Sequence, residues 1–152
     1  MSVQVNVVQT FVDSLISATE EIVDFPLEYR KGSIKILDTE EIHIQSEGIF
    51  ASKMCFQLEH SLVEEILKRM LKHKKLTSDI RDLYLGEYIN ILSGHALTRI
   101  NNIIGKSSRL TVPIVGAGAI KEKIYKQNCV IAFTSEYGDM LLHINYEWNE
   151  YL

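Results

Sequence analysis

The spacing of the hydrophobic residues changes along the chain between a helical and a strand-like period. Near the N-terminus, apolar residues from Val8 to Val23 recur at helical offsets with acidic residues between them, which predicts an amphipathic helix. This helix should end near Pro26, because the residue before a proline is disfavoured in the α region. The chain therefore begins with one helix that buries a single face.

After this helix the apolar residues alternate with polar ones, as they do in strands that have one buried face. The runs at Ile34–Ile36 and Ile42–Ile44 are separated by Asp38-Thr39-Glu40, which predicts a β-hairpin with its turn at these three residues. A third strand is expected to follow directly. Its apolar residues are Met54, Phe56 and Leu58.

Two further helices are predicted in the middle of the chain. Ser61-Leu62-Val63-Glu64 has the pattern of a capping box, and apolar residues at helical spacing continue from it to Leu71. A longer helix should begin after Ser78 or Asp79 and end near Ile104, with Gly105 as its stop signal.

In the C-terminal third of the chain, the sequence pattern again predicts strands. They lie at 109–115, 129–134 and 140–146, and Gly138-Asp139 marks a turn between the last two. The total is three main helices and about six strands connected by hairpins rather than by βαβ units. This favours one domain over residues 1–152, an α/β (α+β) sandwich with a largely antiparallel sheet packed against long helices.

The long helix has two distinct faces on a helical wheel with about 100° per residue. The apolar stripe that should face the core consists of Leu85, Ile89, Leu92, Ala96, Ile100 and Ile103. The opposite face consists of Leu83, Glu87, Asn90, Gly94, Leu97, Thr98 and Asn101. Glu87 and Asn90 lie one turn apart on this outward face. Leu83 and Leu97 are expected to give it an apolar rim, as a partner-binding surface would have.

Composition and charge exclude several classes of protein. The chain has 16 basic and 20 acidic residues, a formal charge of −4, which argues against a nucleic-acid-binding protein with its basic face. No apolar run approaches the roughly 18 residues that span a bilayer, and no signal-peptide pattern opens the chain. We therefore expect a cytoplasmic protein that does not insert into membranes.

The cysteines and histidines do not have the spacing of a known metal motif. Cys55 and Cys129 are the only cysteines and are expected to be buried reduced thiols. The five histidines have no HExxH or CxxC-type partner spacing, so the sequence predicts no metal site.

The outward face of the long helix carries a pattern that resembles a known signature. Gly86-Glu87-Tyr88-Ile89-Asn90-Ile91-Leu92-Ser93-Gly94 is followed, 22 residues after Asn90, by Pro113. This is similar to the signature of the CheC/CheX/FliY chemotaxis phosphatases: Asp or Ser, three residues, Glu, two residues, Asn, about 22 residues, then Pro. The leading position of that signature falls on Leu83. The single Glu-x-x-Asn and the chain length resemble the CheX branch of the family.

The resemblance implies a CheC-like fold and hydrolysis of the aspartyl phosphate on a CheY-type receiver domain. Glu87 and Asn90 would be the catalytic pair, with Asn90 orienting the attacking water and Glu87 contacting the receiver's lysine. Mg²⁺ would be bound by the receiver, so this chain would need no cofactor. Leu83, Gly94, Leu97 and Thr98 would contact the partner, and Gly86 and Pro113 would be structural residues of the motif.

Three alternatives remain for the function at this point. The first is the phosphatase itself, and the resemblance also suggests that it forms a homodimer through sheet edges. The second is a non-catalytic module of the same fold that binds a receiver or another signalling partner, an interpretation that Leu83 favours. The third is a purely structural dimer module. Decay of a phosphorylated receiver with and without the protein distinguishes the first from the others.

Overall fold

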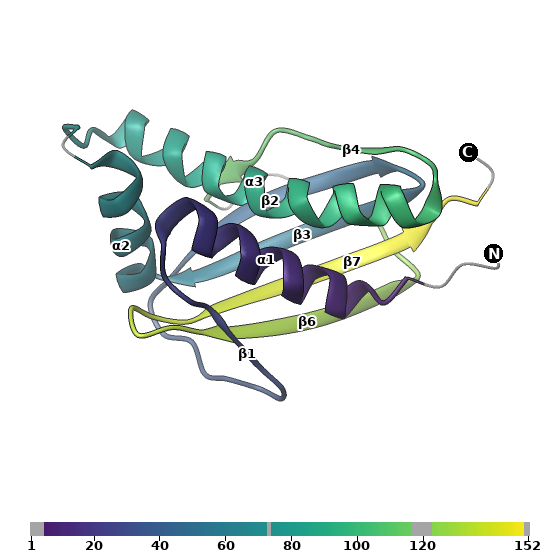
Figure 1. Cartoon of the computed structure of the whole chain (residues 1–152), viewed down its shortest axis with the longest axis horizontal. Coiled ribbons are helices and arrows are strands. Elements are labelled where there is room, and N and C mark those ends of the chain that lie inside the picture. Colours follow the sequence, from purple (N-terminus) through teal and green to yellow (C-terminus); the bar gives the residue numbers. More distant parts are fainter. Residues whose placement is uncertain (1–4, 73, 117–122, 151–152) are drawn as a thin grey trace.

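The fold is known from a computed structural model, which describes residues 5–72, 74–116 and 123–150 (Figure 1). Its three helices are α1 (Val7–Val23), α2 (His60–Leu71) and α3 (Ser78–Ile104). Its strands are β1 (Glu28–Arg30), β2 (Thr39–Gly48), β3 (Phe50–Glu59), β4 (Ser108–Leu110), β5 (Ile114–Val115), β6 (Gln127–Thr134) and β7 (Met140–Trp148).

The seven strands of the described residues form one antiparallel sheet. Its order is β1-β6-β7-β3-β2-β4, and β5 also pairs with β2. In Figure 1, α1 and α3 lie side by side across one face of this sheet, and α2 lies at one end of it. The opposite face carries no helix of the described residues. The α+β fold with an antiparallel sheet, predicted from the spacing of apolar residues, is confirmed.

The core lies between the helices and alternate residues of the central strands. The strand residues that face the helices are fully or almost fully buried, because successive side chains of a strand point to opposite faces. They include Ile42, Ile44, Met54, Phe56, Leu58, Ile131, Phe133, Leu142 and Ile144. Residues that alternate with them, such as His43 and Cys55, are only half-buried and point to the helix-free face.

The first hairpin is not the one that the sequence predicts. Residues 31–38 form no strand, and the long hairpin consists of β2 and β3, with ten residues each and Thr39 opposite Glu59. Its turn is at Gly48, which has a φ of +111°. The alternation at Ile34 and Ile36 is real but short, and two strands of ten residues form a longer ladder with a larger buried face. The strand through Met54 and Phe56 is confirmed.

The capping box predicted at Ser61 is also absent. α2 begins at His60 with Glu59 as its N-cap, and the Glu59 side chain makes no capping hydrogen bond. It accepts instead from the backbone N–H of Asp139 at 2.8 Å. Because β3 runs directly into α2, the helix begins without a loop residue that could provide a cap, and Ser61 already lies in its first turn.

The strand predicted at 109–115 is divided into two short ones. β4 and β5 both pair with β2, but Thr111, Val112 and Pro113 between them are not in a strand. A proline has no backbone N–H to donate to a ladder, so it interrupts the pairing. The other two C-terminal strands and the turn at Gly138 agree with the prediction.

The N-terminal end of α3 is held to the sheet by a charged network. Arg81 of α3 donates to the Glu40 carboxylate of β2, and His60 Nδ1 lies 2.9 Å from the same carboxylate. Partial burial acts to raise the pKa of Glu40, but the hydrogen bonds from Arg81 and His60 prevail and hold this pKa below its ordinary value.

We therefore expect Glu40→Gln to lower the free energy of unfolding by about 1 kcal/mol at neutral pH, as for a partly exposed charged hydrogen bond. The native pKa is depressed, so this stabilisation is complete above the unfolded pKa of about 4.3. It disappears as the pH falls through the lower native pKa. Urea unfolding of both proteins from pH 7 to pH 3 checks this.

The matched control for this prediction is Glu47→Gln. Glu47 pairs with Arg109 at 3.6 Å, but both side chains are largely exposed, so this substitution should change the free energy of unfolding very little. Equal effects of the two substitutions at every pH would contradict the role of Glu40.

Candidate functional site

The rotation of α3 about its axis is set by one buried stripe. Its five central members are fully buried, as the helical wheel predicts: Leu85, Ile89, Leu92, Ala96 and Ile100. Tyr88 is also fully buried, and its hydroxyl lies 2.8 Å from the Thr19 hydroxyl of α1. These contacts leave Glu87 exposed and Asn90 half-buried on the side of α3 away from the sheet.

Two residues of the predicted wheel are misplaced. Ile103, assigned to the core, is 47% exposed, because it lies in the last turn of α3 beyond the packed part of the stripe. Leu97, assigned to the exposed rim and to partner contact, is 4% exposed and belongs to the core. The wheel treats the outward side as open to solvent, whereas the chain after Gly105 folds back beside this part of the helix. The assignment of Leu97 to partner contact is therefore wrong.

The returning chain lies antiparallel to α3. Asn101 Nδ2 donates to the Ser108 carbonyl at 3.1 Å, and Leu110 lies next to Gly94. Further along, Pro113 lies next to Gly86. Eight helical residues from Gly86 to Gly94 rise about 12 Å, and three extended residues from 110 to 113 cover about 10 Å. The two lengths match, which explains physically why Pro113 follows the helix at this distance in the sequence.

Gly86 and Gly94 both leave room for a small side chain. A Cβ added to Gly86 would lie 3.7 Å from the Pro113 Cβ, and one added to Gly94 would lie 3.9 Å from the Leu110 Cδ1. Both are ordinary van der Waals distances, so an alanine fits at either position, and only larger side chains would displace the returning chain.

An open groove lies between α3 and this returning chain. It is lined by Asp82, Leu83, Gly86, Glu87, Asn90, Leu110, Thr111, Val112 and Pro113. Leu83 is 69% exposed and Val112 is 81% exposed, so each side of the groove carries one large apolar side chain. Leu83 and Val112, rather than the predicted pair Leu83 and Leu97, therefore form the apolar rim next to Glu87 and Asn90.

The side chains of Glu87 and Asn90 in the groove are available to a partner. Within the described part of the chain, no hydrogen bond or ion pair engages the side chains of Glu87 or Asn90. Asp82 adds a second carboxylate, paired at 3.9 Å with Arg81. An amide next to carboxylates, with exposed apolar groups on both sides, can bind a cationic surface and orient one water.

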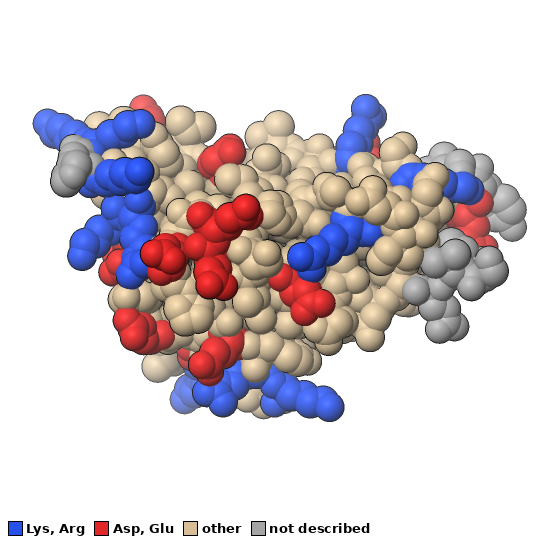
Figure 2. Space-filling view, viewed as in Figure 1, with Lys and Arg blue, Asp and Glu red and all other residues tan. Residues whose placement is uncertain are grey.

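The charges on the helix-covered face are of both signs. Figure 2 shows acidic side chains over α1 and a group of lysines and arginines at the α2–α3 end of the molecule. The acidic residues of α1 include Asp13, Glu20 and Glu21. This face therefore has no continuous basic surface.

The structure brings most of the sequence-predicted site residues to one place and adds others. Glu87, Asn90, Leu83, Gly86 and Pro113 line the groove. Thr98 is exposed and Gly94 half-buried further along α3. Sequence reasoning missed Leu110, Thr111 and Val112. Their only signal was their position directly before Pro113.

The fold is that of known chemotaxis proteins. CheX from Vibrio vulnificus superposes with a TM-score of 0.75 at 21% identity, over 94% of this chain and 97% of that one. A CheC-like superfamily protein from Shewanella sp. PV-4 gives a TM-score of 0.73 at 23% identity, over 95% and 99%. The CheX–CheY–BeF3–Mg²⁺ complex from Borrelia burgdorferi gives a TM-score of 0.71 at 13% sequence identity, over 95% of this chain and 99% of the matched chain.

Searches with the whole amino-acid sequence find no match for it. No protein-family model matches it, and no curated protein sequence matches it. Among the residues that the structure describes, none of the helices combines the length and the apolar character needed to cross a bilayer. The chain therefore has a CheX- or CheC-like α+β fold.

Proposed function

We propose that this chain is a CheX-type phosphatase that hydrolyses the aspartyl phosphate of a CheY-type receiver in chemotaxis signalling. The observation that carries the proposal is the groove of α3, in which Glu87, Asn90 and Pro113 occupy the signature positions. The side chains of Glu87 and Asn90 make no hydrogen bond or ion pair with another described residue. The similarity in fold to CheX, including CheX in complex with CheY from Borrelia burgdorferi, supports it.

The chemistry needs positioning rather than a protein nucleophile. A water attacks the phosphorus, the bond between the phosphorus and the aspartyl oxygen breaks, and the products are inorganic phosphate and the free carboxylate of the receiver. The Asn90 amide has both a donor and an acceptor, so it can bind this water and aim it in line. The Mg²⁺ and the lysine that stabilise the charge on the phosphoryl group would come from the receiver.

Glu87 is expected to act in docking, through a charge-assisted contact with the receiver's lysine. Glu87→Lys would place two cations against each other and should raise the Kd for the phosphorylated receiver at least tenfold. Glu21→Lys is the matched control, since it makes the same change of charge at an exposed position of α1. Binding can be measured by titrating a labelled receiver activated with beryllofluoride. An unchanged Kd for Glu87→Lys would show that docking occurs elsewhere.

One observation favours a second candidate, a receiver-binding module without catalysis. Leu83 stands where the signature has Asp or Ser, and it is exposed at the edge of the groove. The test is the decay of a phosphorylated receiver in Mg²⁺, with and without the wild-type protein. Binding without faster decay would support the module, and a gain of activity in Leu83→Asp would then identify the missing group.

The proposal includes a homodimer that forms through the edges of the sheet. β1 and β4 are the edge strands of the sheet and have three residues each. An exposed strand edge can pair with another chain. Light scattering at several protein concentrations measures whether the protein forms this dimer.

A further inference from the structure

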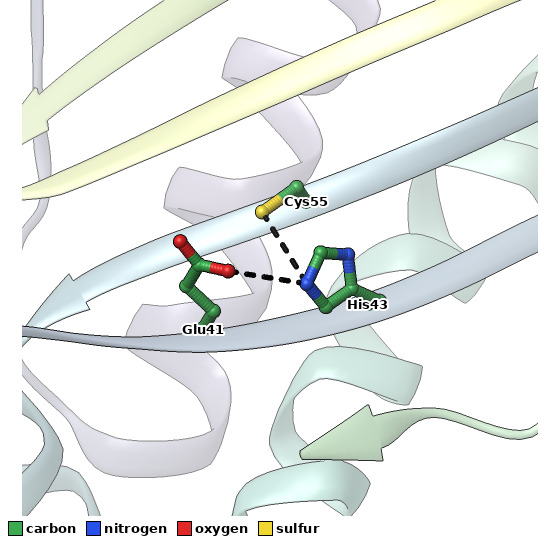
Figure 3. A group of neighbouring side chains, drawn as sticks. All are labelled: Glu41, His43 and Cys55. Atoms are coloured by element: carbon green, nitrogen blue, oxygen red, sulfur yellow. Dashed lines mark hydrogen bonds and ion pairs between the residues drawn. The ribbon is translucent and has the colours of Figure 1, made fainter. Parts of the chain in front are cut away.

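The helix-free face of the sheet brings together residues that are distant from the groove of α3. In the register of β2 and β3, His43 lies opposite Cys55, and Glu41 lies opposite Gln57. Neighbouring positions Ile42, Ile44 and Phe56 point to the helices and are buried. The Glu41, His43 and Cys55 side chains therefore extend from the other face, and Figure 3 shows them pointing toward one another.

The three polar atoms converge on one point. His43 Nε2 lies 3.3 Å from Glu41 Oε2 and 3.9 Å from Cys55 Sγ. The three ligand atoms all lie within 4.8 Å of one another. In a tetrahedral zinc site with Zn–S near 2.3 Å and Zn–N and Zn–O near 2.0–2.1 Å, ligand atoms are about 3.4–3.6 Å apart. The His43–Glu41 distance already fits this geometry, and the His43–Cys55 distance is about 0.4 Å longer than it. The Glu41–Cys55 distance, which is at most 4.8 Å, would have to shorten by up to about 1.2 Å.

We propose that Glu41, His43 and Cys55 form a binding site for Zn²⁺, with the fourth position open to water. A thiolate, an imidazole and a carboxylate are the ligand types that zinc takes in proteins, and harder ions such as Mg²⁺ or Ca²⁺ prefer oxygen alone. The site lies on the sheet face opposite α3, so it is independent of the proposed phosphatase function.

Further residues on the same face orient the carboxylate. Gln57 Nε2 donates to Glu41 Oε1 at 3.2 Å, which leaves Oε2 directed at His43. The other end of the same amide, Gln57 Oε1, lies 2.8 Å from His143 Nε2 on β7. Hydrogen bonds of this kind orient the ligands of metal sites and raise their affinity. Gln57 is thus a positioning residue of the site.

Binding requires that the thiol lose its proton. Burial, followed by the charge of Glu41, raises the pKa of Cys55 to about 11, so the metal-free side chain is a neutral thiol. As the S–Zn bond forms, this proton goes to solvent. The charges of the thiolate and the Glu41 carboxylate then balance those of Zn²⁺.

The proposed site is open to solvent, and the second cysteine of the chain provides a control for its test. The Glu41 side chain is 39% exposed and that of His43 is 13% exposed, so an ion can reach the site from solvent. Cys129 pairs with Ile144 in the register of β6 and β7 and packs against the core on the helix side of the sheet. It is a matched control for Cys55, because it has the same thiol but belongs to no cluster of metal-ligand side chains among the residues that the structure describes.

The test uses the full chain without a histidine tag, reduced and stripped of metal. Competition with a chromophoric chelator should show one high-affinity Zn²⁺ per chain, and Co²⁺ should give the near-ultraviolet absorption of a thiolate complex. Cys55→Ser should remove this absorption and lower the affinity by more than 100-fold, whereas Cys129→Ser should change neither. Gln57→Leu should lower the affinity about 10- to 100-fold.

His60→Ala is the control for His43→Ala, because His60 also lies between two carboxylates, those of Glu40 and Glu64. The His43 variant should lose Zn²⁺ binding, and the His60 variant should retain it. The proposal is overturned if no stoichiometric binding occurs, if Cys55→Ser binds as tightly as wild type, or if His60→Ala abolishes binding. Circular dichroism of each variant verifies that its fold is retained. None of these outcomes bears on the phosphatase assay.

Discussion

Replacing Asn90 with alanine should slow receiver dephosphorylation by a factor on the order of 10² to 10³ while the fold is retained. Loss of one group that positions water or stabilises developing charge typically has an effect of this size. Asn90 is half-buried at the groove, and no hydrogen bond to another described residue depends on its side chain. The free energy of unfolding should therefore change by less than about 1 kcal/mol.

The measurement is the lifetime of a phosphorylated CheY-type receiver in Mg²⁺ at several concentrations of this protein. Asn90→Ala should lower the maximal rate, whereas Glu87→Ala should mainly raise the concentration needed for half-maximal rate. Asn102→Ala is the matched control, since Asn102 is an exposed residue of the same helix outside the groove. If Asn90→Ala were as fast as wild type, the water-orienting role of this residue would be wrong.

Replacing Gly48 with alanine should have the largest effect on stability, a loss of about 3 kcal/mol or more. Gly48 has a φ of +111°, which an L-residue with a side chain rarely adopts. A Cβ there would lie 2.6 Å from the Ser107 carbonyl oxygen and 2.8 Å from the Ser108 Cα. These atoms belong to the backbone, so they cannot move without displacing β4. Backbone strain and steric overlap therefore add.

Gly105→Ala separates these two contributions. Gly105 caps α3 with a φ of +74°, but a Cβ there meets nothing within 4 Å. Its substitution should cost about 1 kcal/mol, which is backbone strain alone. Urea unfolding of both variants gives the comparison. Equal losses at Gly48 and Gly105 would show that the contact with the returning chain is not tight.

Gly48 also connects stability with the site. The chain segment that its Cβ would displace continues through Leu110 to Pro113, which lines one side of the groove. We therefore expect the Gly48→Ala protein that remains folded to bind the receiver more weakly, because Val112 and Pro113 would no longer be held beside α3.

The local pattern of the sequence determined the helices well. α3 has the predicted bounds to within two residues, and its stripe from Leu85 to Ile100 is buried as predicted. Helical periodicity is a property of neighbouring residues, so a single chain is sufficient to reveal it. The same periodicity placed Glu87 and Asn90 on the outward side and connected them, through a resemblance, with Pro113.

Pairing between distant segments could not be read in this way. The alternation at Ile34 and Ile36 is as regular as that at Ile42 and Ile44, yet only the second run forms part of a strand. A strand pattern indicates that one face is buried but not which partner pairs with it. For this reason the sequence does not predict the hairpin of β2 and β3, and the predicted turn at Asp38-Thr39-Glu40 lies about ten residues before the observed one at Gly48.

The sequence by itself thus determined the helices, the class of fold and the outward face of α3, because these follow from short-range periodicity. Only the tertiary structure decided what covers that face. The return of the chain after Gly105 buries Leu97 and makes Val112 the apolar neighbour of the groove. Strand register likewise places Cys55 beside His43, twelve positions away along the chain. Such contacts depend on long-range packing, which no local pattern of residues specifies.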